Sequence, residues 1–163
     1  MIVAGEWDFA RKTVGDVSAV GAVYALKFYK LLIYVKLKPM KYEEAKKLLD
    51  IYGEAWLKQD PELILTIFTP DAVYDDSKEP ENHGHNEIRY YWVNKVIGEQ
   101  KDIKFKLLNV WTDRNEVIAE WDAEFVDIKR NLRVQMREIG IFTTKDGKFS
   151  SLREYYKTTK TPL

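Results

Sequence analysis

The fold is decided by residues 140–156, GIFTTKDGKFSSLREYY, which belong to a strand-like region that runs from Ile103 to Thr158. Apolar and polar residues alternate through this last third of the chain, and a period of two is typical of strands with one buried face. We therefore expect a run of long antiparallel strands. The alternation also assigns each side chain to the inner or the outer face, so it indicates which acidic residues can reach a pocket.

Two of these strands place one acidic residue on the inner face. Residues 117–125 and 132–143 alternate between mostly apolar inner positions and mostly polar outer ones, and Glu138 is the only charged residue in either inner set. Burial of an unpaired carboxylate costs several kcal/mol, so Glu138 needs a partner, a proton or a wet pocket. The outer charges are expected to form cross-strand ion pairs of roughly 0.2 to 1 kcal/mol each. These charges are Glu120 and Glu124 on one strand and Arg133 and Arg137 on the next.

The composition excludes several classes of function. The 163 residues suit one domain with a real core, and 13% of them are aromatic. The formal net charge is zero, with 26 basic and 26 acidic residues, so nothing marks a surface for nucleic acid or an anionic membrane. The chain has no cysteine, which excludes disulfides, thiolate catalysis and thiolate metal sites. We expect no nucleic-acid partner, no membrane association and no cofactor.

Residues 1–39 differ in character from the rest, and we expect them to be an N-terminal extension of a domain at residues 40–163. The extension carries six basic and three acidic residues. An apolar run extends from residue 17 to residue 35, but Lys27 and Lys30 interrupt it. As a transmembrane helix this run would lose about 2.5 to 3.5 kcal/mol for each lysine.

Three other interpretations of this extension stay open. A signal peptide lacks support, because acidic residues precede the first basic ones and no small-residue cleavage site follows the apolar run. A helix near residues 17–34 that packs on the domain or on a partner is favoured. Met40 could instead be the start of the native protein. Because neither a signal peptide nor a membrane span is favoured, we expect a cytoplasmic protein.

Three helices are expected before the long strands. The first covers residues 41–59, where apolar residues recur at helical spacing. Asp60-Pro61 then supplies a capping side chain and a proline at the first position of a short second helix. A short strand at residues 71–76 precedes a third helix at residues 85–97.

This order of elements predicts an α+β fold. The three N-terminal helices would pack on the concave face of a curved, mostly antiparallel sheet, which gives a cone-like barrel with a hollow. The sequence contains no internal repeat, no phosphate-binding glycine loop and no nucleophile elbow. A pocket is therefore expected in the hollow between helices and sheet.

Several short motifs occur in order along the domain. They are Ala55-Trp56 ahead of Asp60-Pro61, LTIFTPDAVY at 65–74, Gly84-His85 with Ile88-Arg89 and Tyr91-Trp92, Ala119-Glu120-Trp121, and Asp146-Gly147-Lys148 ahead of LREYY at 152–156. In these motifs the chain from residue 42 to 158 resembles the nuclear transport factor 2-like superfamily, in its SnoaL-like branch, which has the ketosteroid isomerase-like fold. The resemblance implies a homodimer with a pocket for a small apolar or polycyclic organic molecule. It implies no single function, because this fold hosts isomerases, dehydratases, cyclases, epoxide hydrolases and proteins that only bind.

The resemblance to ketosteroid isomerase suggests catalytic residues. Its helical tyrosine and its general-base aspartate align with Tyr52 and Asp76, and its second oxyanion donor aligns near Gly140, which has no side chain to donate. Glu138, one inward step earlier, is the nearest substitute. With Asp76 as base and Tyr52 or Glu138 as donor, the site could move a proton next to a carbonyl group. The alternative is that Tyr52 is an ordinary core aromatic and that Asp76 begins a solvated loop.

Two other enzymes of this fold match less well. The catalytic arginine and aspartate of limonene epoxide hydrolase align with Trp121 and Ala123, and its second aspartate aligns with Lys157, so that mechanism is disfavoured. Scytalone dehydratase relies on two pocket histidines, whereas His83 and His85 lie together at the start of the third helix. These histidines would also need further ligands to bind a metal ion, and the sequence indicates none. We expect no metal site.

Three hypotheses on function follow. The leading one is a domain that binds a small organic molecule in a largely apolar pocket, and the second is an isomerase, dehydratase or cyclase with Asp76 as general base. The third is a scaffold without a ligand, whose outer sheet face or N-terminal extension docks another protein. Homodimerisation is implied by the resemblance and supported by the outward positions of Ile118, Ile139 and Ile141. The residues expected to line the pocket are Trp56, Tyr74, Trp92, Trp121, Met136 and Phe142.

Overall fold

The computed structural model describes Tyr24, Lys27 and residues 39–163. The chain divides into two units after Lys38, and the fold described below is that of the unit from Pro39 to Leu163. Tyr24 and Lys27 are helical, and the rest of the helix predicted at residues 17–34 lies outside the described residues. Among the helices that the structure describes, none combines the length and the apolar character that a membrane crossing needs.

The helices of this unit begin near the residues that the sequence predicts. The structure contains α3 (Tyr42–Lys58), α4 (Pro61–Leu65), α5 (Gly84–Tyr91) and a π-helical segment, η1 (Trp92–Ile97), which continues α5. Asp60 accepts hydrogen bonds from the backbone N–H groups of Glu62 and Leu63, and Pro61 occupies the first position of α4, as predicted. The sequence does not predict the π-helical end of the third helix, because an apolar period of 3.6 residues does not distinguish a π-helical turn from an α-helical one.

Six strands of this unit form one sheet. Their bounds are β1 (Phe68–Asp76), β2 (Asn82–His83), β3 (Gln100–Asp113), β4 (Glu116–Asp127), β5 (Leu132–Lys145) and β6 (Lys148–Pro162). The order across the sheet is β2-β1-β6-β5-β4-β3, and every neighbouring pair is antiparallel except β1 and β6. β1 starts three residues earlier than predicted, because Phe68 already pairs with Phe149 of β6. β2 lies between the predicted short strand and the predicted third helix, where the sequence predicts no strand.

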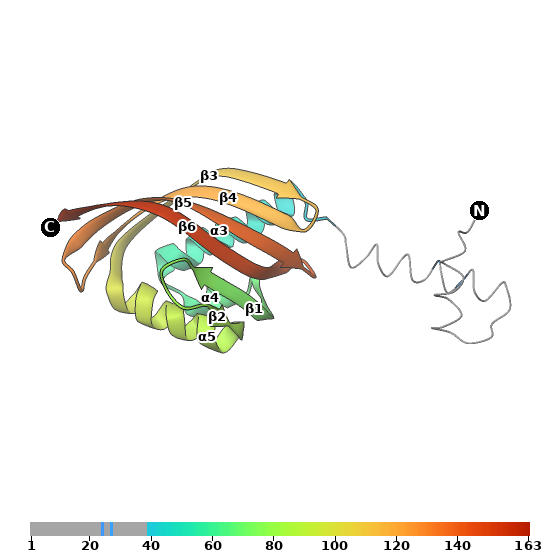
Figure 1. Ribbon diagram of the computed structural model, residues 1–163, viewed down its shortest axis with the longest axis horizontal. Helices are drawn as coiled ribbons and strands as arrows, with labels where there is room; N and C mark the ends of the chain where they lie inside the picture. Colours follow the sequence, from blue (N-terminus) through green and yellow to red (C-terminus); the bar gives the residue numbers. More distant parts are fainter. Residues whose placement is uncertain (1–23, 25–26, 28–38) are drawn as a thin grey trace. The chain divides into compact units, whose positions relative to one another are not determined.

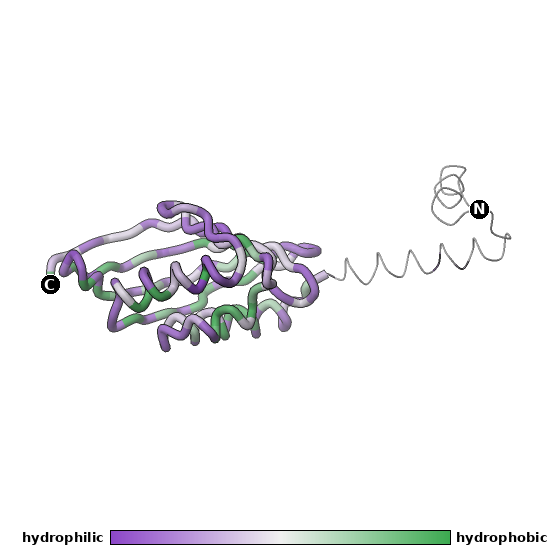
Figure 2. The backbone as a smooth tube through the Cα atoms, turned by 90° about the horizontal axis from the view of Figure 1, so that it is seen from below, coloured by the Kyte–Doolittle hydropathy of each residue, from purple (hydrophilic) through white to green (hydrophobic). Residues whose placement is uncertain are grey.

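The helices lie on the concave side of the sheet. The long strands β3 to β6 arch over α3, and α4 and α5 lie below them (Figure 1). Along strands and helices, short hydrophobic and hydrophilic stretches follow one another, as the alternation in the sequence requires (Figure 2). The sheet stays open, with β2 and β3 at its two ends. This arrangement confirms the predicted α+β architecture.

The outer face of the sheet carries the predicted ion pairs. Glu124 contacts Arg133 with a distance of 2.7 Å between Oε1 and Nη1, and Arg137 contacts both Glu120 and Asp122. Hydrogen bonds from Gln135, Lys104 and Arg133 lower the pKa of Glu124 to about 2. The same face also exposes large apolar side chains, namely Trp111, Ile118, Ile139 and Tyr155.

Candidate functional site

A cavity of about 420 Å³ lies between the helices and the inner face of the sheet. Among the acidic side chains that line it, three come from neighbouring strands: Asp76 from β1, Glu154 from β6 and Glu138 from β5. The strand register brings them together, because Asp76 pairs directly with Glu154, and Glu154 lies diagonally across β5 and β6 from Glu138. The strand pairing therefore brings these three carboxyl groups close together in the cavity.

Glu154 occupies the centre of this group. Its residue is only 4% exposed, and one of its oxygens, Oε1, accepts hydrogen bonds from Tyr52 Oη at 2.6 Å and Tyr74 Oη at 2.9 Å. Burial raises the pKa of Glu154 to about 8, and the negative charge of Asp76 acts in the same direction, whereas the two tyrosine hydroxyls oppose the shift. Glu154 therefore holds a proton at neutral pH.

Glu138 is the second buried carboxyl group of the cavity. It is 3% exposed, and Trp121 donates its indole N–H to Glu138 Oε2 at 3.1 Å. Burial raises the pKa of Glu138 well above its usual range, and ionisation of Glu154 or Asp76 raises it further. The sequence required a partner, a proton or a wet pocket for this residue. The structure supplies an indole donor, and the raised pKa favours the protonated form.

Gly140 makes room for this arrangement. A Cβ atom at Gly140 would lie 2.6 Å from the Trp121 ring and 2.8 Å from the Phe142 ring. Because Gly140 faces Glu154 across β5 and β6, the missing side chain also leaves Glu154 without a direct neighbour on that strand.

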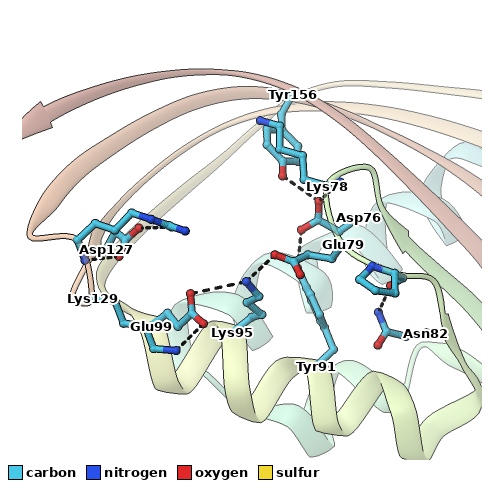
Figure 3. A network of polar contacts seen from close by, with 12 residues as sticks. Asp76, Lys78, Glu79, Asn82, Tyr91, Lys95, Glu99, Asp127, Lys129 and Tyr156 are labelled. Carbon is cyan, nitrogen blue, oxygen red and sulfur yellow. Dashed lines mark hydrogen bonds and ion pairs between the residues drawn. The ribbon is translucent and has the colours of Figure 1, made fainter.

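Asp76 differs from the two glutamates in its hydrogen bonds. Tyr156 donates to Oδ1 and Tyr91 donates to Oδ2, both at 2.8 Å, and the two rings approach Asp76 from opposite sides (Figure 3). Two hydroxyl donors suit a carboxylate, which only accepts hydrogen bonds. Burial and the charge of Asp76 raise the pKa of both tyrosines, so they stay protonated and keep donating.

Each buried glutamate keeps one oxygen for a ligand. Among the residues that the structure describes, none donates a hydrogen bond to Glu138 Oε1 or to Glu154 Oε2. Both residues line the cavity, so a bound molecule can meet these oxygens. A protonated carboxyl group can there donate its hydrogen to a carbonyl or hydroxyl oxygen.

Ion pairs surround the opening of the cavity. Lys95 of η1 contacts Glu79 at 2.5 Å and Glu99 at 3.7 Å, and Glu99 also binds Lys129 at 2.8 Å (Figure 3). These pairs connect the segment after β1, the end of η1 and the turn between β4 and β5. The prediction of a largely apolar lining is wrong at this end, because charged side chains from these segments reach the rim.

The structure separates the predicted site residues into two groups. The three proposed catalytic residues, Asp76, Tyr52 and Glu138, all line the cavity. Trp56, Tyr74, Trp92 and Met136 also line it. Trp121 and Phe142 do not, because both are fully buried behind the lining residues, so direct contact with a ligand in this cavity is not expected.

The sequence reasoning missed Glu154. The signal was present, because Leu152, Glu154 and Tyr156 alternate with exposed residues in β6 in the same way as the inner residues of β5. The sequence prediction assigns an inner face to β4 and β5 and none to β6.

The histidines take no part in the site. His83 is exposed and lies near Glu81, and the His85 ring contacts the backbone oxygen of Phe68 at 3.1 Å. The described part of the chain contains no cluster of histidine, aspartate and glutamate side chains that could hold a metal ion.

The fold is shared with several solved structures of low sequence identity. A putative isomerase from Bacillus subtilis is 22% identical with a TM-score of 0.63, over 71% of this chain and 88% of that one. An LEH-like epoxide hydrolase from M. tuberculosis is 20% identical with a TM-score of 0.59, over 71% of this chain and 84% of that one. A putative polyketide cyclase from Sinorhizobium meliloti is 19% identical with a TM-score of 0.56, over 67% and 94%. At these identities the likeness concerns the fold alone.

A comparison with proteins of curated function gave no match. The SnoaL-like domain family, in contrast, matches residues 49–152, which cover α3 from its middle, both shorter helices and most of the sheet. This chain belongs to the SnoaL-like domain family.

Proposed function

We propose that this protein is an acid–base enzyme that moves a proton within a small organic molecule bearing a carbonyl group. Isomerases, dehydratases and cyclases carry out chemistry of this class. The observation that carries the proposal is the meeting of three carboxyl groups in a single cavity of a size suited to small ligands. Asp76 accepts two tyrosine hydrogen bonds, whereas Glu138 and Glu154 are buried and have raised pKa values.

Asp76 serves as the general base in this proposal. Its carboxylate takes a proton from the carbon next to the carbonyl group, and the electron pair of that C–H bond moves onto the carbonyl oxygen as an enolate forms. Tyr91 and Tyr156 hold the carboxylate in place through their hydroxyl groups. The hydrogen bonds from these tyrosines fix its direction before a substrate arrives.

Glu138 and Glu154 stabilise the oxygen on which negative charge develops. A neutral carboxyl group donates a hydrogen bond to the enolate oxygen and can then transfer its proton to that oxygen or back to carbon. Tyr52 and Tyr74 bind the opposite oxygen of Glu154, which leaves Oε2 to act. The catalytic arginine and aspartate of limonene epoxide hydrolase align with Trp121 and Ala123, so hydrolysis of epoxides is not proposed.

The test is exchange of α-protons in D₂O, followed by NMR on a panel of steroid, aryl and alkyl ketones. This assay needs no knowledge of the natural product. Asp76→Asn should lower the exchange rate by about 100-fold or more, which is the usual contribution of a positioned general base. Asp75→Asn serves as the control, because Asp75 precedes Asp76 on the opposite face of β1.

The outcomes separate the hypotheses. Exchange that is lost in Asp76→Asn and kept in Asp75→Asn supports the proposal. Equal exchange in the wild type and in Asp76→Asn contradicts the role of Asp76. Binding of the ketones without any exchange by the wild type would make the protein a binding domain rather than an enzyme.

A further inference from the structure

The wall that β5 and β6 give to the cavity changes in character along its length. Glu154 is the first residue of β6 that lines the cavity, and Tyr156, Thr158 and Lys160 follow it on the same face. The partners of the last three on β5 are Glu138, Met136 and Val134. Because inner residues recur every second position, this row spans about 20 Å from Glu154 to Lys160. The wall is therefore acidic at one end, apolar in the middle and basic at the other end.

Lys160 differs from the other cations of the cavity. Lys95 and Arg130 are bound by acidic side chains, Lys95 by Glu79 and Arg130 by Asp127 at 2.9 Å. Among the described residues, Lys160 has no ion pair. Its charge remains available at the end of this row that lies farthest from Glu154.

Lys78 is already engaged by the inner part of the site. Its ammonium group lies 4.1 Å above the centre of the Tyr156 ring, and its charge lowers the pKa of Glu138. Lys160, in contrast, lies opposite Val134 of β5, at the end of the row that is farthest from Glu154.

We infer that the substrate is an elongated molecule with an anionic tail, which Lys160 binds, and a neutral carbonyl group, which enters among Asp76, Glu138 and Glu154. This inference rests on the proposed function and adds the substrate class. An anionic group at the inner end would be repelled by Asp76, so only one orientation is favourable. The middle section of the ligand is apolar, because Val134, Met136 and Phe125 line the cavity there. An ammonium group binds carboxylate and phosphate alike, so the tail is defined here as an anion.

The test measures the binding of 9-oxodecanoate, 9-oxodecyl phosphate and the neutral 9-oxodecanamide by calorimetry. All three carry a ketone at one end of a ten-carbon chain. The wild type should bind the anions more tightly than the amide. Lys160→Gln should weaken the binding of the anions about twofold to fivefold, as expected for an exposed ion pair, and leave the amide unchanged. The relative losses for carboxylate and phosphate identify the preferred tail.

The matched control is Lys157→Gln. Lys157 belongs to the same strand and the same charge is removed, but its side chain lies on the opposite face of the sheet. An equal loss in Lys157→Gln and Lys160→Gln would overturn the inference, as would binding of the amide as tight as that of both anions. If no probe binds while α-proton exchange persists, this inference fails and the proposed function stands.

Discussion

Among single residues, Glu154 determines the chemistry of the cavity. Asp76 is its register partner on β1, and Glu138 lies diagonally across from it on β5. Three carboxyl groups at such positions cannot all carry charge, because each charge opposes the ionisation of the others. Burial is the largest cause of the raised pKa of both glutamates and favours their protonated forms, whereas Asp76 accepts two hydroxyl hydrogen bonds.

The raised pKa of Glu154 predicts a pH-dependent effect of Glu154→Gln on stability. Between the usual value of 4.5 and about 8, the folded state holds a proton on Glu154 that the unfolded state has lost. Each pH unit in this window therefore costs the wild type about 1 kcal/mol of unfolding free energy, and the glutamine variant avoids this loss. From pH 5 to pH 8, urea unfolding should show the variant gaining about 1 to 3 kcal/mol relative to the wild type. A difference that stays constant or shrinks with pH would contradict the assignment.

Glu124→Gln supplies a control of opposite sign. The folded-state pKa of Glu124 is lowered to about 2, so its contribution to stability is present above the usual value of 4.5 and is lost as the pH falls through about 2. The Glu124 variant should be less stable than the wild type at neutral pH, and this deficit should shrink in acid. The two glutamates therefore distinguish a protonated inner carboxyl group from a charged outer one.

At the scale of elements, the sequence predicted the features that follow from local signals, such as strand alternation and helix capping. The alternation in β4 and β5 placed Glu138 on the inner face, and the Asp60-Pro61 start of α4 followed from capping chemistry. β6 carried an equally clear alternation, and assigning its faces as well would have identified Glu154. This part of the candidate site was therefore readable from the sequence.

Contacts between distant elements could not be predicted in this way. Tyr156 lies 80 positions from Asp76, and only the parallel pairing of β1 with β6 brings them together. The ion pairs around the opening depend on the path of η1, whose π-helical geometry has no signature in the apolar period. Trp121 and Phe142 were assigned to the correct face, but which inner residues border a cavity depends on how neighbouring side chains fill the space.

For the whole molecule, the outer sheet face predicts self-association. Trp111 pairs with Ile118 and Ile139 pairs with Tyr155, and all four side chains are exposed on the sheet. Covering such an apolar patch is favourable, and the homodimer expected from the family resemblance would do so. Sedimentation of the full chain should give a dimer, and Ile139→Glu should give a monomer. Thr159→Glu adds the same charge on the neighbouring strand β6, and a dimer lost equally in both variants would argue against this interface.

The central claim is that a buried carboxyl group in the cavity keeps its proton at neutral pH. The most direct measurement is the pH titration of the Glu154 side-chain carboxyl carbon by NMR, with Glu154→Gln to assign its signal. We predict a midpoint near 8 and a protonated group at pH 7, since burial and the charge of Asp76 both favour the neutral form. A midpoint at or below 4.5 would mean a charged Glu154 and would contradict the proposed acid–base site.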